Sequence, residues 1–147
     1  MTYKTRLMGV ASLVLIFVST VAATDDATTL KEIMQDLGDN TADIAGGLLT
    51  DDFEKVALGA TAIAGHPQIP AVQVQLVAAE LGPEMPAFKQ LDTLVHDLSL
   101  EISAAATALD REAAISGYQR MIEGCFACHR GYKERVAAVL SEDPGQR

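Results

Sequence analysis

The chain has 147 residues, 49% of them hydrophobic and 21% charged, which is the composition of one globular domain rather than of a disordered chain. Its net charge of −9 repels nucleic acid phosphates and anionic lipid headgroups, so neither is expected as a partner. A basic protein surface is the kind of partner that this charge favours.

The first 23 residues have the pattern of a secretory signal peptide. Lys4 and Arg6 precede an uncharged apolar run of 17 residues, which ends in Val21-Ala22-Ala23, where small residues suit a signal peptidase. A retained membrane anchor is the alternative, since about 17 residues is the short limit for spanning a bilayer. We expect cleavage after Ala23, which leaves a periplasmic domain of residues 24–147 with a net charge of −11 and no stable membrane insertion.

Beyond this segment, the apolar residues fall into four runs in which steps of three and four alternate. The first run ends near the Gly46-Gly47 pair, the second begins with a capping pattern at Asp51 and ends at Gly65, and the fourth follows Asp110 as an N-cap. The predicted helices span residues 30–47, 51–65, 86–109 and 111–140.

The segment between the second and third runs is the least regular part of the sequence. Pro67, Pro70 and Pro83 interrupt residues 66–85, so we expect a long connection in which residues 71–81 could form a short helix. In the four runs, an average spacing of 3.5 residues keeps one side of each helix facing nearly antiparallel neighbours. The predicted fold is therefore all-α, an antiparallel four-helix bundle.

The only two cysteines, Cys125 and Cys128, lie on the fourth predicted helix, with His129 directly after them. Spacings of three and four residues place all three side chains on one face of that helix. CxxCH is the attachment pattern of haem c, in which both thiols bond to the haem vinyl groups and the imidazole binds the iron. Export fits this chemistry, because thioether formation removes the thiols from disulfide exchange. We expect one covalently attached haem c.

Two other kinds of site use a CxxC pair. A dithiol oxidoreductase places the pair at a helix N-terminus after a strand, whereas this pair lies deep inside a helical pattern. A structural zinc site needs two more ligands, and the remaining histidines, His66 and His96, are isolated in the chain. The sequence has no nucleophile and base pattern and no nucleotide-binding loop, so an enzyme is not expected.

The chain resembles the cytochrome c′ family of bacterial four-helix-bundle cytochromes, which includes the methionine-ligated c-556 type. The resemblance rests on a CxxCH motif in the last helix, on the continuation "RGYK" and on Met34 in the first helix, and it covers residues 27–140. It implies that His129 is the proximal iron ligand, that Met34 stands on the distal side, and that Lys133 lies near the proximal histidine. It also implies a homodimer as a common state.

One position departs from the family. An arginine near a haem propionate is usual four residues before the distal residue, and here that residue is Leu30, with Lys31 beside it. The expected function is one-electron transfer with redox partner proteins. If Met34 only packs in the pocket, five-coordinate iron would instead bind nitric oxide or carbon monoxide. A third alternative is a haem-free helical interaction module with a Cys125–Cys128 disulfide.

Overall fold

The structure is a computed structural model and describes residues 28–141. The predicted signal peptide and its cleavage site at Ala23 lie outside the described residues, as do residues 24–27 and 142–147. Between residues 28 and 141 the chain is helical and forms no strand, which confirms the all-α class. No helix in this range is both long and apolar enough to cross a membrane. The elements are α1 (Leu30–Thr50), α2 (Phe53–Ala64), α3 (Ala71–Leu81), the 3-10 turn η1 (Gly82–Glu84), α4 (Met85–Thr107) and α5 (Arg111–Ser141).

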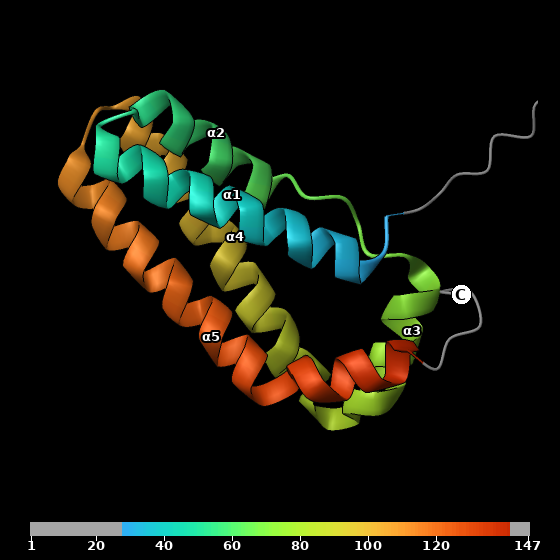
Figure 1. The fold of residues 1–147 in the computed structure, drawn as a ribbon. Helices are drawn as coiled ribbons and strands as arrows, with labels where there is room; N and C mark the ends of the chain where they lie inside the picture. Colours follow the sequence, from blue (N-terminus) through green and yellow to red (C-terminus); the bar gives the residue numbers. More distant parts are fainter. Residues whose placement is uncertain (1–27, 142–147) are drawn as a thin grey trace, which may run out of the picture.

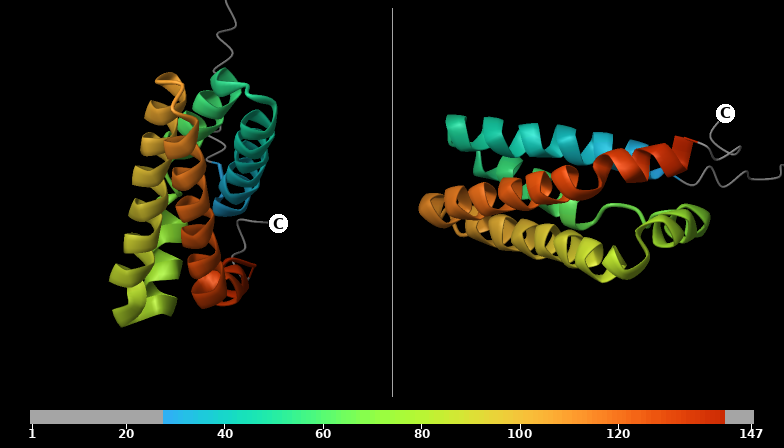
Figure 2. Two further views of the ribbon diagram at one scale, coloured as in Figure 1. Left: turned by 90° about the vertical axis from the view of Figure 1, so that its left-hand side faces the viewer. Right: turned by 90° about the horizontal axis from the view of Figure 1, so that it is seen from below.

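Four of the helices form the predicted bundle (Figure 1). α1 packs along α2, α2 along α4, and α4 along α5, whereas α1 and α5 contact each other at few positions. α1 and α2 run antiparallel, as do α4 and α5, and α3 lies across one end of the bundle against the last turns of α5 (Figure 2). The side between α1 and α5 is therefore the least closely packed.

α1 is longer than the sequence predicts. It continues past the Gly46-Gly47 pair to Thr50 and ends where Asp51 adopts a left-handed conformation with a φ of 60°. Gly47 is buried against α2, where an added Cβ would lie 2.8 Å from Val56 Cγ2. The prediction that this glycine ends the helix is wrong, because its small size serves the contact between α1 and α2 instead.

The start of α2 is set by Asp52 rather than by Asp51, which corrects the predicted cap. The Asp52 carboxylate accepts a hydrogen bond from the Lys55 backbone N–H at 3.0 Å. Asp51 instead forms an ion pair with Arg111, the first residue of α5. The turn between α1 and α2 is thereby fastened to the turn between α4 and α5.

The junction of α4 and α5 lies slightly earlier than predicted. α4 ends at Thr107, so Leu109 does not continue its apolar stripe; Leu109 has a φ of 57° and is 70% exposed. Asp110 caps α5 as predicted, since its carboxylate accepts the Ala113 N–H at 3.0 Å.

α3 is the short helix anticipated within the proline-containing connection, and polar contacts fasten it to two bundle helices. The buried Gln73 Oε1 accepts the Leu30 N–H at 2.8 Å, so α3 satisfies one of the free N–H groups at the start of α1. The Arg135 guanidinium of α5 donates to the carboxylates of Glu80 and Glu84 at 3.0 and 2.8 Å. These contacts close the α3 end of the bundle.

Two apolar clusters hold the described part of the chain together. The larger apolar cluster joins all four bundle helices and consists of Ile44, Val56, Ala60, Ile63, Leu98, Ile102, Ala106 and Met121. The smaller apolar cluster joins α3 to the start of α1 and the end of α5, and consists of Leu30, Val77, Leu81, Val136 and Leu140. The bundle is thus filled at both ends, with a region between them that neither cluster occupies.

Candidate functional site

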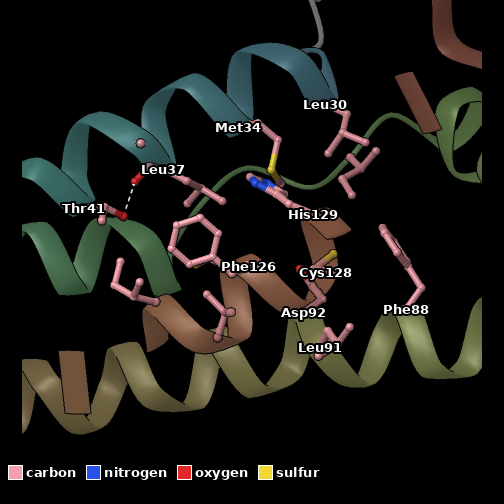
Figure 3. A pocket seen from close by; sticks show the side chains of 15 residues that line it. Leu30, Met34, Leu37, Thr41, Phe88, Leu91, Asp92, Phe126, Cys128 and His129 are labelled. Atoms are coloured by element: carbon pink, nitrogen blue, oxygen red, sulfur yellow. Dashed lines mark hydrogen bonds between the residues drawn. The ribbon is translucent and has the colours of Figure 1, made fainter. Parts of the chain in front are cut away.

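A cavity of about 270 Å³ lies in this region, between α1, α4 and α5 (Figure 3). Its walls are mostly aliphatic and aromatic, with a few polar groups, which is the usual form of a cofactor site. The lining residues are Leu30, Met34, Leu37, Gly38 and Thr41 of α1, Phe88, Leu91, Asp92 and Val95 of α4, Ile122, Cys125, Phe126, Cys128 and His129 of α5, and Ile69 of the connection.

The α5 wall brings together all three residues of the CxxCH motif. Cys125 and Cys128 are free thiols of intermediate burial. Burial raises the pKa of the Cys125 thiol, and burial followed by the charge of Asp92 raises the pKa of the Cys128 thiol. Both side chains are therefore protonated thiols at neutral pH, close together on one wall of an apolar space.

The α1 wall carries Met34 on the other side of the cavity from the motif. In Figure 3 the Met34 thioether and the His129 imidazole extend toward each other from α1 and α5. Met34 is 41% exposed, although a methionine that only fills a core is buried among its neighbours. The structure therefore leaves the Met34 sulfur free to contact a group held in the cavity.

Aromatic residues border the cavity on two sides. The rings of Phe88 on α4 and Tyr132 on α5 pack edge to face, with centroids 5.4 Å apart and an interplanar angle of 90°. Phe126, between the two cysteines in sequence, lines the cavity and is 62% exposed. The Phe88–Tyr132 pair joins α4 to α5 beside the motif, whereas Phe126 has room for an apolar group against its ring.

The family resemblance draws attention to Lys133 and Leu30, of which only Leu30 lines the cavity. Lys133 follows His129 by one turn of α5, is exposed, and is not part of the cavity lining. Leu30 does line the cavity, but it is 5% exposed and also belongs to the smaller apolar cluster. An arginine side chain in place of Leu30 would have to leave that cluster, which accounts for the apolar residue there.

The other two histidines are not part of the cavity lining. His66 follows α2, and its Nδ1 lies 2.7 Å from the Pro67 carbonyl oxygen. His96 is on α4 with an exposed side chain, and its Nδ1 lies 3.1 Å from the Asp97 carboxylate. Within residues 28–141, no three histidine, cysteine, aspartate or glutamate side chains are grouped so that they could hold a metal ion by themselves.

Sequence reasoning missed two residues of the site, Asp92 and Phe126. Asp92 follows Phe88 by four residues and precedes Val95 by three, so it occupies a position on the apolar stripe of α4. An acidic residue on the apolar stripe of the predicted helix was the feature of the sequence that could have identified Asp92. Phe126 is not on the face of α5 that contains both cysteines. Whether its side chain lines the cavity depends on the separation of α1 and α5, which the sequence does not show.

No protein-family model, curated protein or solved structure matches this chain.

Proposed function

We propose that this protein is a c-type cytochrome that transfers single electrons in the periplasm through one haem attached to Cys125 and Cys128. The observation that carries the proposal is that all three residues of the CxxCH motif line one apolar cavity. A motif that matched by chance would have no reason to coincide with such a cavity.

The residues present fit a covalently attached haem. Two neighbouring thiols can form the thioether bonds, and the adjacent His129 imidazole can bind the iron from the same helix. Leucine, valine and phenylalanine side chains suit the apolar faces of a macrocycle. When bound, the haem supplies an iron that gains or loses one electron.

The chain's own residues have three roles in this proposal. The cysteines hold the cofactor, His129 donates a lone pair to the iron, and the apolar walls exclude water. Met34, from the opposite wall, is the candidate sixth ligand, and a thioether ligand raises the reduction potential and blocks the iron to small molecules. The negative charge of the chain favours a redox partner with a basic surface.

A second function is supported by the space on the α1 side of the cavity. Gly38 lines the cavity one turn after Met34, and a Cβ added to Gly38 would have no atom within 4 Å. If the Met34 thioether does not bind the iron, this space admits nitric oxide or carbon monoxide. The protein would then bind a gas rather than transfer electrons.

The visible spectrum of the reduced, haem-loaded protein separates these two functions. Electron transfer with Met34 ligation predicts sharp low-spin bands, whereas an open iron predicts broad high-spin bands and fast binding of carbon monoxide. Met34→Leu should convert the first spectrum into the second, while the stability cost stays below about 1.5 kcal/mol. Met85→Leu is the matched control, because Met85 packs against the smaller apolar cluster and not in the cavity. Identical spectra and carbon monoxide rates for wild type and Met34→Leu would exclude Met34 as the ligand.

The role of His129 has its own test. His129→Ala should leave the thioether bonds intact and change both the reduction potential and the spectrum. His96→Ala, on the exposed side of α4, should change neither. A spectrum and potential unaffected by His129→Ala would remove His129 as the iron ligand.

A further inference from the structure

One polar side chain lies among the core positions of α3. Gln73 is 4% exposed and shares its face of α3 with Val77 and Leu81, which belong to the smaller apolar cluster. A buried amide costs free energy unless hydrogen bonds compensate it. The Gln73 Oε1 has such a bond, because it accepts the backbone N–H of Leu30 at 2.8 Å. The reason for a glutamine at this position therefore lies in α1 rather than in α3.

This hydrogen bond holds α1 at the turn that borders the cavity. Leu30 is the first residue of α1, and Met34 follows it by one helical turn on the same face. Both side chains line the cavity, and Figure 3 shows them extending into it from α1. The first four N–H groups of a helix have no partner within the helix, and the Gln73 amide supplies one for Leu30. The backbone is thus fixed one turn before the Met34 side chain.

α2 does not provide this support, because α1 extends beyond the end of α2 (Figure 1). A Cβ added to Gly59 of α2 would lie close to Asn40 and Ile44 of α1, so the two helices are in contact there. α2 ends about one and a half turns later, at Ala64, whereas Leu30 lies about three turns before Asn40. α5 contacts α1 at few positions. The first turn of α1 therefore depends on α3 and on the smaller apolar cluster for its position.

We propose that Gln73 is a positioning residue for Met34: its hydrogen bond to the Leu30 N–H fixes the first turn of α1, and thereby the direction in which the Met34 thioether enters the cavity. In haem-loaded protein, the same contact keeps the thioether within reach of the iron. This second part rests on the proposed function, whereas the first part concerns the chain alone.

The first part is tested on the full chain produced without haem attachment, with helix content checked by circular dichroism. Gln73→Leu keeps a side chain of similar size in α3 and removes the acceptor. The Leu30 N–H should then exchange with solvent about tenfold faster, which corresponds to the loss of one ordinary hydrogen bond. In nuclear magnetic resonance spectra of methionine-labelled chain, the methyl signal of Met34 should move toward its position in unfolded chain. The signal of Met121, which is completely buried, should not move.

Two further variants separate the hydrogen bond from packing. Gln73→Glu keeps a side-chain oxygen that accepts the Leu30 N–H, so it should retain the slow exchange. Val77→Ala, one turn further along the same face of α3, removes apolar contact from the smaller apolar cluster and keeps the acceptor. It should lower the stability of the chain and leave the Met34 signal in place. If Gln73→Leu loses its helix content, Gln73→Met, whose side chain is unbranched like that of glutamine, takes its place.

An unchanged Leu30 exchange rate or an unmoved Met34 signal in Gln73→Leu would overturn the proposal. Equal changes in Val77→Ala would also overturn it, because they would assign the effect to packing.

In haem-loaded protein, Gln73→Leu should reduce the low-spin fraction of the reduced spectrum and speed the binding of carbon monoxide, while Gln73→Glu and Val77→Ala stay near wild type. Equal spectra and carbon monoxide rates in wild type and Gln73→Leu would overturn the link to iron ligation, and so would an open iron in wild type. A chain that never takes up haem would instead contradict the proposed function, and the haem-free measurements would still decide the role of Gln73.

Discussion

The larger apolar cluster and the cavity lie in the same bundle and are built from the same kind of helices, yet one is filled and the other is open. In the cluster, Ile44 and Ile102 are completely inaccessible to solvent. In the cavity, Met34 and Phe126 are 41% and 62% exposed, although both side chains are large and apolar. Exposed apolar side chains around a cavity are a feature of ligand sites, because burying them requires another molecule.

Glycines show how the two regions differ in backbone spacing. At Gly117, in the filled part of α5, an added Cβ would lie 2.8 Å from Ile102 Cγ1. At Gly38, in the cavity wall of α1, the same atom would have no neighbour within 4 Å. Close approach of α4 and α5 thus excludes a side chain at Gly117, whereas a side chain at Gly38 would meet open space.

The largest expected effect on stability is at Ile102. Ile102→Ala should lower the free energy of unfolding by about 2–5 kcal/mol, because it creates a cavity in a filled core. Leu91→Ala, in the wall of the existing cavity, should cost only about 1 kcal/mol, since Leu91 is half-buried and borders open space. Denaturant unfolding of both variants measures the difference. Equal losses would mean that the two regions are packed alike.

Replacing either glycine by alanine should change the free energy of unfolding by a smaller amount, and in opposite directions in the two regions. Gly117→Ala should destabilise the protein by about 1–3 kcal/mol through overpacking against Ile102. Gly38→Ala should stabilise it by up to about 1 kcal/mol, because alanine is the better helix former and meets no atom. Thermal unfolding of the two variants tests this. Destabilisation by Gly38→Ala in haem-free protein would contradict the open wall.

The smallest expected effect on the free energy of unfolding is at the exposed ion pair between Arg111 and Asp51, which is outside the larger apolar cluster. The Arg111 guanidinium, by hydrogen bonding, lowers the pKa of the Asp51 carboxyl below its ordinary value. The pair therefore contributes stability above the ordinary carboxyl pKa of about 4, and the contribution is lost as the pH falls through the lowered value. Asp51→Asn keeps a residue that tolerates the left-handed backbone, so it isolates the charge. Its stability deficit should be small at pH 7 and vanish at strongly acidic pH. A deficit that persists there would show that the charge is not its cause.

The helices could be predicted from the sequence because their signals are local. Asp110 caps α5, and the steps of three and four along α4 describe a real stripe. The end of α1 could not be predicted, since a glycine used for close helix contact and a glycine that ends a helix look the same in sequence. Gly47 is the first kind, and only the position of Val56 on α2 shows it.

The candidate site was predictable only in part, for a similar reason. The grouping of Cys125, Cys128 and His129 follows from their spacing on one helix. That a cavity adjoins them, and that Met34 and Asp92 line it from α1 and α4, depends on distances between helices that are far apart in sequence. Lys133 shows the opposite case, because its position one turn after His129 does not bring it into the cavity lining.

Covalent attachment of haem tests the central claim most directly. The full chain would be produced in a bacterium that attaches haem c to exported proteins, then denatured and analysed by intact mass and by haem staining of a gel. We expect one haem per chain that survives denaturation, and none in the Cys125→Ala, Cys128→Ala double variant. Wild-type chain recovered from the same cells without haem, with its cysteines free or joined as a disulfide, would contradict the assignment of this cavity as a haem site.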